Sequence, residues 1–166
     1  RVEHGVTVLP LSVVASAAGA ELTWDGESAA ARLKLAGAVP PQASYDETDL
    51  YWLSRIISAE SRGEPLLGQI AVGNVVLNRV NSGQFPNTVK EVVFDRKYGV
   101  QFEPVSNGTI YDRPTDSAML AAKLCLEGAA PVGDSLYFYA PALSAGTWIS
   151  TSRAYYTTIG CHKFYG

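Results

Sequence analysis

Residues 49–65 read DLYWLSRIISAESRGEP, and this stretch decides how the rest of the chain is interpreted. Its apolar residues recur at helical spacing and form one stripe: Leu50, Leu53, Ile56 and Ile57. Asp49 precedes the stripe, and its carboxylate suits the free amides of a first helical turn. Gly63 and Pro65 follow, and both residue types end helices. The segment therefore predicts an amphipathic helix that begins after Asp49.

Glu60 lies four residues after Ile56, so it falls on the apolar face in the last turn of this helix. A carboxylate directed toward Leu and Ile side chains either finds a partner or has a raised pKa. A raised pKa suits a general acid that works near neutral pH. The structural alternative is an ion pair with one of three arginines: Arg55, Arg62 or Arg79.

The composition predicts a folded protein with a substantial core. Of the 166 residues, 47% are hydrophobic and 17% charged, which argues against global disorder. The formal net charge is −3, so we expect no nucleic-acid partner. No apolar run reaches about 18 residues, so we expect no membrane span. Nine Tyr and three Trp permit stacking on sugar rings.

The two cysteines, Cys125 and Cys161, are compatible with one disulfide or with two separate buried thiols. A nucleophilic pair of Cys125 with His162 would suit a wall peptidase. However, Cys125 falls near the C-terminal end of a predicted helix, where the helix dipole disfavours a thiolate. His4 and His162 lie far apart and no HExxH motif occurs, so we expect no metal.

The N-terminal residues 1–36 form a separate small unit. The pattern predicts a helix over 9–19, a strand over 21–24, a turn at Asp25-Gly26 and a return strand over 28–35. This piece is too small to bury a core alone. Residues 37–48, with Pro-Pro and polar residues, indicate a linker to a second domain over 49–166.

After the first helix of this domain, the sequence predicts a mainly helical α+β fold with a small antiparallel sheet. A helix over 65–80 is apolar nearly all round, so its Asn74, Asn78 and Arg79 need polar partners. Thr88 and Glu91 predict a capping box that begins a short helix through 93. A long loop or irregular hairpin is expected over 95–114, with Asn107-Gly108 at its tip. The rest of the chain predicts a helix over 115–128, a strand over 135–140, a loop over 141–152 and a strand over 154–159.

Glycoside hydrolysis by Glu60 would need a second carboxylate. Spacing selects none of the candidates: Glu64, Asp95, Glu103, Asp112 and Asp134.

Two parts of the sequence also resemble known families. The run VLPLSVVASAAGAELTWDGES (8–28) resembles the copper amine oxidase N-terminal-like domain, a name that does not imply copper. The motifs ISAESRGEPLLGQIAVGNVVLNRVNSGQFPNTVKEVVF, QFEPVSNG, LYFYAP and TIGCHKFYG, in that order, resemble the catalytic domain of the spore-cortex-lytic enzyme/cell wall hydrolase family over 49–166. This resemblance implies a lysozyme-like fold of the lytic transglycosylase type, acting on the MurNAc–GlcNAc linkage of peptidoglycan.

The resemblance also implies roles for particular residues. Glu60 matches the catalytic acid, and one glutamate suffices if the muramyl 6-hydroxyl closes onto C1 to give a 1,6-anhydro product. Substrate-binding roles are implied for seven further residues: Gln101, Phe102, Tyr137, Tyr139, Asn78, Trp148 and His162.

The combined prediction is an exported monomer of the cell wall or spore envelope that binds peptidoglycan strands and needs no cofactor. Spore cortex and vegetative wall both remain open as substrates. The alternatives are a muramidase that cleaves the same bond with water, a catalytically silent peptidoglycan-binding module, and the Cys125/His162 peptidase.

Overall fold

The computed structural model describes residues 2–3, 6–7, 9–26, 30–35, 45–97, 99–144 and 147–166. Contacts divide the chain into two compact units, Arg1–Ala43 and Ser44–Gly166. Across the described residues, no helix combines the length and the apolarity needed to cross a membrane. His4 lies outside the described residues.

The first unit has the predicted helix and antiparallel strand pair, together with a shorter strand pair that the sequence did not signal. Asp25, predicted in the turn, instead belongs to the first strand of the longer pair and lies opposite Ala30. Its elements are β1 (Val2–Glu3), β2 (Val6–Thr7), α1 (Leu11–Ala17), β3 (Ala20–Asp25) and β4 (Ala30–Leu35). Strands β3 and β4 are antiparallel, with Trp24 opposite Ala31. Among its described residues, Ala15 is the buried hydrophobic one, while Trp24 is 69% exposed. This small unit therefore has little core of its own.

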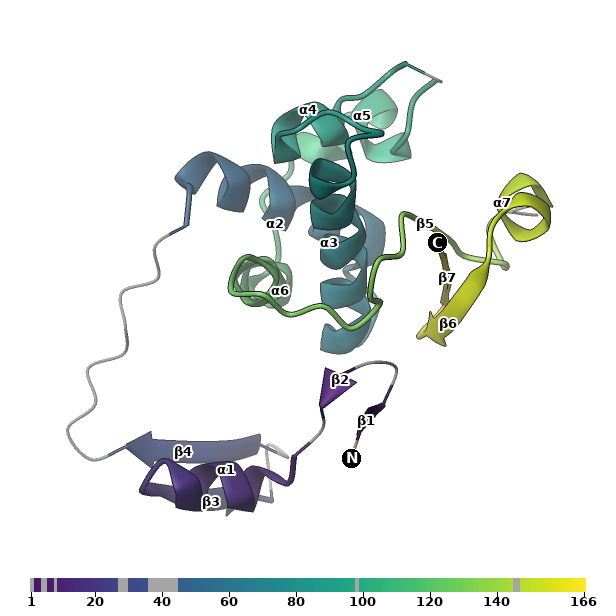
Figure 1. Ribbon diagram of the computed structural model, residues 1–166. Coiled ribbons are helices and arrows are strands. Elements are labelled where there is room, and N and C mark those ends of the chain that lie inside the picture. The colour runs from purple at the N-terminus through teal and green to yellow at the C-terminus, as the bar shows by residue number, and fades with distance from the viewer. Residues whose placement is uncertain are drawn as a thin grey trace. The chain divides into compact units, whose positions relative to one another are not determined.

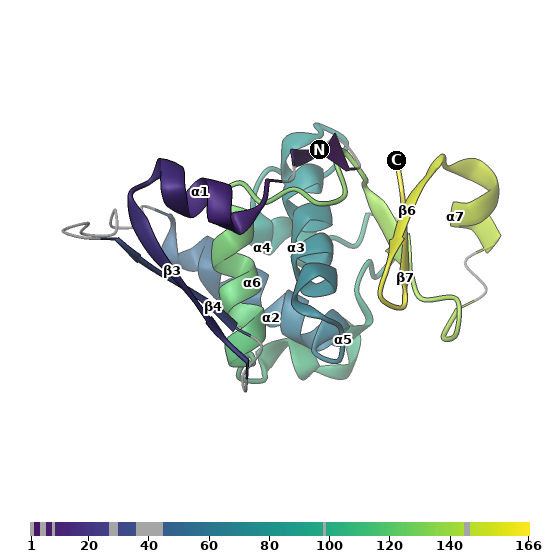
Figure 2. The same cartoon turned by 90° about the horizontal axis from the view of Figure 1, so that it is seen from below.

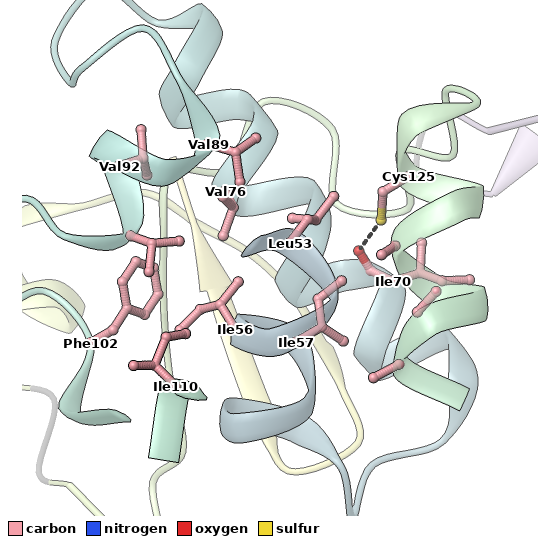
Figure 3. Packing of buried hydrophobic residues seen from close by; sticks show 14 residues of the cluster. Leu53, Ile56, Ile57, Ile70, Val76, Val89, Val92, Phe102, Ile110 and Cys125 are labelled. Atoms are coloured by element: carbon pink, nitrogen blue, oxygen red, sulfur yellow. Dashed lines mark hydrogen bonds between the residues drawn. The ribbon is translucent and has the colours of Figure 1, made fainter. Parts of the chain in front are cut away.

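Three helices form the centre of the second unit (Figure 1). They are α2 (Glu47–Ser61), α3 (Leu66–Asn81) and α6 (Asp116–Leu126). Their facing side chains contribute most of the main core (Figure 3), which includes the predicted α2 residues Leu53, Ile56 and Ile57, all fully buried. Burial of that stripe fixes which way the last turn of α2 faces.

The start of α2 differs from the prediction. Asp46, not Asp49, caps the helix, because its carboxylate accepts hydrogen bonds from the backbone N–H groups of Thr48 at 2.7 Å and Asp49 at 3.2 Å. Asp46 has the extended backbone that a capping residue requires, whereas Asp49 already lies in the first turn. The helix therefore begins at Glu47, two residues inside the predicted linker 37–48.

Close contact between the three helices depends on Gly73 of α3. A Cβ atom at Gly73 would lie 2.7 Å from Cys125 Sγ and 2.7 Å from Ile57 Cδ1. The Cys125 thiol donates to the Ile70 carbonyl at 3.3 Å (Figure 3), and burial raises its pKa to about 12. Both cysteines are free thiols, with Cys125 buried and Cys161 exposed. Neither arrangement predicted for the pair is therefore correct.

The segment between α3 and α6 is more helical than predicted. It contains α4 (Val89–Val93), α5 (Glu103–Asn107) and the 3₁₀ helix η1 (Thr109–Tyr111). The capping box is confirmed, because Thr88 Oγ1 accepts from the Glu91 N–H at 3.2 Å and donates to Glu91 Oε2 at 2.9 Å. The predicted loop or hairpin over 95–114 is wrong, because Gly108, with φ of 84°, ends α5 in a left-handed conformation.

The chain ends in a three-stranded antiparallel sheet of order β5-β7-β6. Its strands are β5 (Tyr137–Tyr139), β6 (Tyr155–Ile159) and β7 (His162–Tyr165). The predicted loop over 141–152 is wrong in part, since it contains α7 (Thr147–Ser152). Figure 2 shows the sheet beside α3, with α7 beyond it. A mainly helical α+β fold with a small antiparallel sheet is confirmed.

Candidate active site

Glu60 occupies the last turn of α2 and is half-buried. Its pKa is raised to about 7, chiefly by burial and further by the charge of Glu103, while Arg79 opposes the rise. None of the described residues forms a hydrogen bond or an ion pair with its carboxylate. A carboxyl group in this state is about half protonated at neutral pH, so it can both donate and accept a proton.

The predicted ion-pair alternative finds no support at two of the three arginines. Arg55 lies over the Tyr51 ring at 3.6 Å and donates to the Tyr51 carbonyl at 3.3 Å. Arg62 caps the C-terminal end of α2 through its backbone. Only Arg79 acts on the charge of Glu60, and it does so without forming a direct ion pair within the described structure.

Arg79 lies on α3 and is 6% exposed. Its Nε donates to the Leu136 carbonyl at 2.8 Å, so α3 is tied to the segment that leads into β5. Its guanidinium lies 4.9–5.7 Å from the centroids of three aromatic rings, those of Phe85, Phe102 and Tyr137. Burial lowers its pKa to about 10, so Arg79 still carries its charge at neutral pH.

Of the five candidate second carboxylates, Glu103 is the one that acts electrostatically on Glu60. It is the first residue of α5. Glu64 is engaged elsewhere, because it accepts a hydrogen bond from the Cys161 N–H. Asp95 accepts from the Lys97 N–H at 2.9 Å. Asp112 is exposed and Asp134 lines a separate small cavity.

A cavity of about 790 Å³ lies beside Arg79. Three of the predicted substrate-binding residues line it: Gln101, Tyr137 and Trp148. Trp148 is 58% exposed and meets the Tyr137 ring edge-on at 5.6 Å. Glu60 is not among the lining residues, but Arg79 both lines the cavity and acts on the pKa of Glu60. The acid and the cavity therefore share one charged neighbour.

The structure does not bring Phe102 or His162 to the cavity wall. Phe102 is 3% exposed, and its ring lies 6.5 Å from that of Phe138. His162 is 6% exposed and meets Phe138 edge-on at 5.3 Å. Burial lowers the pKa of His162, so it is neutral near pH 7. Both side chains therefore contact Phe138, which lines the cavity, without lining the cavity themselves.

Tyr139 and Asn78 also lie away from this cavity. The Tyr139 ring stacks on that of Tyr165 at 5.8 Å. The Asn78 amide donates to the carbonyls of Gly133 at 2.7 Å and Ser135 at 2.9 Å. Asn78 thus has the polar partners that its place on a buried helix requires, and it fixes the path of the chain before β5.

Sequence reasoning missed Arg153 and Phe85, which line the cavity beside Tyr137. Arg153 Nη2 donates to the Tyr137 hydroxyl at 3.1 Å, and the guanidinium lies 5.3 Å from the Trp148 ring centroid. The sequence carries no signal for this contact, because Arg153 is an isolated cation after a segment that was expected to be a loop.

The described residues contain no group of three or more His, Cys, Asp or Glu side chains able to hold a metal ion. The described part of the site combines the Glu60 carboxyl with a basic, aromatic cavity, and Arg79 is near both.

Residues 63–165 match the family model described as Cell Wall Hydrolase, a span that begins just after Glu60. A spore cortex-lytic enzyme of Bacillus cereus is 40% identical over 120 residues, which are 72% of this chain and 45% of that protein. A cell wall hydrolase CwlJ of Oceanobacillus iheyensis is 32% identical over 103 residues, covering 58% of this chain and 72% of that protein.

Among solved structures, the catalytic domain of the germination-specific lytic transglycosylase SleB from Bacillus anthracis is similar to this chain with a TM-score of 0.67 and 39% identity. The similarity covers 77% of this chain and 100% of that domain. The catalytic domain of the Bacillus cereus SleB protein gives a TM-score of 0.66 at 36% identity. The chain spans less than half the length of the spore cortex-lytic enzymes it matches.

Proposed function

Because the chain belongs to the cell wall hydrolase family, we propose that it cleaves the MurNAc–GlcNAc linkage of peptidoglycan as a lytic transglycosylase, with Glu60 as acid and base. The observation that carries this proposal is the half-buried Glu60 carboxyl, which has no hydrogen-bond or ion-pair partner among the described residues and a pKa raised to about 7. The SleB catalytic domain, named as that of a lytic transglycosylase, supports it at 39% identity.

In the proposed reaction, protonated Glu60 gives its proton to the glycosidic oxygen as the bond from C1 of the muramyl sugar breaks. The Glu60 carboxylate then takes the proton of the muramyl 6-hydroxyl, and O6 bonds to C1. The products are a free 4-hydroxyl on the leaving sugar and a 1,6-anhydromuramyl end. No water is consumed and Glu60 returns to its protonated form, so one carboxyl group serves both steps.

The cavity supplies the binding surface in this proposal. Tyr137 and Trp148 offer ring faces for sugars, and Gln101 offers an amide at the same wall. Peptidoglycan lies outside the plasma membrane, so the proposal also places the protein outside, in the wall or the spore envelope. Spore cortex and vegetative wall are both substrates to test.

The decisive experiment is mass spectrometry of the fragments that residues 1–166 release from purified peptidoglycan, wild type beside Glu60→Gln. The substitution keeps the shape of the side chain and removes the proton donor, so we expect at least a ~100-fold loss of rate. The matched control is Glu127→Gln, which changes an exposed glutamate directly after the C-terminal end of α6.

Each product class selects one mechanism. Anhydromuramyl ends that vanish with Glu60→Gln support the proposal. Reducing muramic acid ends mean that water attacks and would favour a muramidase with Glu103 as base. Peptide cleavage would overturn the proposal and would need a nucleophile other than Cys125, because burial raises the pKa of that thiol to about 12. Binding to sacculi without any cleavage would leave a peptidoglycan-binding module.

A further inference from the structure

The cavity has a charge opposite to that of the whole chain. Three cationic side chains line it, Arg79, Lys97 and Arg153, and its described lining includes no Asp or Glu. The complete chain has a formal net charge of −3. A basic hollow in an acidic protein concentrates anions from solution.

The two guanidinium groups flank one aromatic ring. The Tyr137 centroid lies 5.7 Å from the Arg79 guanidinium carbon and 4.6 Å from that of Arg153. The hydrogen bond from Arg153 Nη2 to the Tyr137 hydroxyl at 3.1 Å holds the second guanidinium over this ring. Both cations are therefore held in place before any ligand arrives, which reduces the entropy lost on binding.

Each of these arginines keeps a buried N–H without a partner. The orphan donors are Nη1 of Arg79 and Nε of Arg153. A buried donor without an acceptor costs free energy, and proteins rarely retain one without a reason. Arg79 is more than nine-tenths buried, and Glu60 and Asp95 are the carboxylates that act on its charge. No described carboxylate forms an ion pair with Arg153.

We propose that this cavity binds a carboxylate carried by the muramyl residue of the substrate strand, with Arg153 as its main contact. The inference rests on the proposed function, because it names the part of peptidoglycan that the cavity recognises. Guanidinium groups are well suited to this task, since their N–H donors match the two oxygens of a carboxylate. The aromatic wall beside them accepts the sugar ring.

Two parts of the polymer can present this carboxylate. One is the lactyl group of a muramyl residue whose stem peptide has been removed, and the other is an acidic group of the stem peptide itself. Three probes separate them: peptide-bearing glycan strands, strands stripped by an amidase so that the lactyl carboxylate is free, and stripped strands whose carboxylates are converted to neutral methylamides.

Binding is measured at equilibrium with end-labelled strands in the Glu60→Gln background, so that cleavage plays no part. Within that background Arg153→Gln removes the charge, Arg153→Lys keeps it, and Arg113→Gln removes an exposed charge away from the cavity. We expect Arg153→Gln to weaken binding of an anionic strand by at least about tenfold and to leave the neutral strand unchanged. Arg153→Lys should recover part of the loss, and Arg113→Gln should cause none.

The pattern across probes identifies the source or rejects the idea. Tight binding of stripped strands selects the lactyl carboxylate, and tight binding of peptide-bearing strands alone selects the stem peptide. Equal affinity for all three strands, or an equal loss on all three with Arg153→Gln, overturns the inference. Anionic binding without cleavage by the wild type would overturn the proposed function and leave this inference standing.

Discussion

The Glu64 carboxylate accepts a hydrogen bond from the backbone N–H of Cys161 at 2.9 Å, which joins two residues 97 positions apart. The bond ties the loop after α2 to the turn between β6 and β7. A Cβ atom at Gly160, where φ is 58°, would overlap the same carboxylate. Glu64, four residues after Glu60, therefore anchors the β6–β7 turn to the segment that follows α2.

We expect Glu64→Ala to lower the free energy of unfolding by about 1–2 kcal/mol, because the Cys161 amide loses a charged acceptor. Urea unfolding midpoints measure this, and Glu127→Ala on the exposed end of α6 is the matched control. Because Glu64 is proposed to have no part in the chemistry, the cleavage products should stay the same. Equal stability of the two variants would show that the Glu64–Cys161 hydrogen bond makes no net contribution to the free energy of unfolding.

The pH dependence of cleavage should have one limb set by Glu60. Glu60, as the proposed proton donor, must be protonated to act, and its pKa is about 7 rather than the ordinary 4.5. The rate kcat/KM should therefore be nearly constant below pH 7 and fall about tenfold per pH unit above it. Initial rates on soluble glycan strands between pH 5 and 9 test this, and a limb near 4.5 would mean that Glu60 is ordinarily solvated.

Glu103→Gln should move that limb to lower pH. The negative charge of Glu103 is the second cause of the raised pKa of Glu60, after burial, so its removal lowers the pKa without returning it to 4.5. Anhydromuramyl products should persist, because the proposed reaction needs one carboxyl group. Loss of activity at every pH would instead assign Glu103 the role of a catalytic base. Glu127→Gln controls for a change in overall charge.

Gly73→Ala should destabilise the protein by about 1–3 kcal/mol, although alanine favours helices over glycine. The added methyl group would meet Cys125 Sγ and Ile57 Cδ1 at 2.7 Å, so one of the helices has to shift. Thermal unfolding of the variant measures the loss. Adding Cys125→Ala to the variant provides room, so the double variant should recover stability relative to the sum of the two single changes. Simple additivity would contradict the proposed contact.

Local patterns predicted the part of the site that a single helix determines. The stripe through Leu53 and Ile56 fixed the face of α2, and that face placed Glu60 in a buried last turn with a raised pKa. The capping residue was predicted wrongly, since Asp46 and Asp49 carry the same side chain and only the backbone conformation separates them.

The remaining parts depend on contacts between distant segments. Arg153 meets Tyr137 because α7 and the residue after it lie beside β5, and no periodicity in the sequence records that arrangement. Asn107-Gly108 misled for a different reason. A left-handed glycine ends helices as readily as it turns hairpins, so the dipeptide alone could not distinguish α5 from a hairpin tip.

The raised pKa of Glu60 derives mainly from burial rather than from one charged partner. Because the pKa of Glu60 depends on how the surrounding side chains pack, many residues can alter that pKa without contacting the Glu60 carboxyl. Substitutions that admit or exclude solvent around the end of α2 should shift the working pH in small steps. Adaptation to acidic or alkaline surroundings therefore does not require a substitution of Glu60 itself.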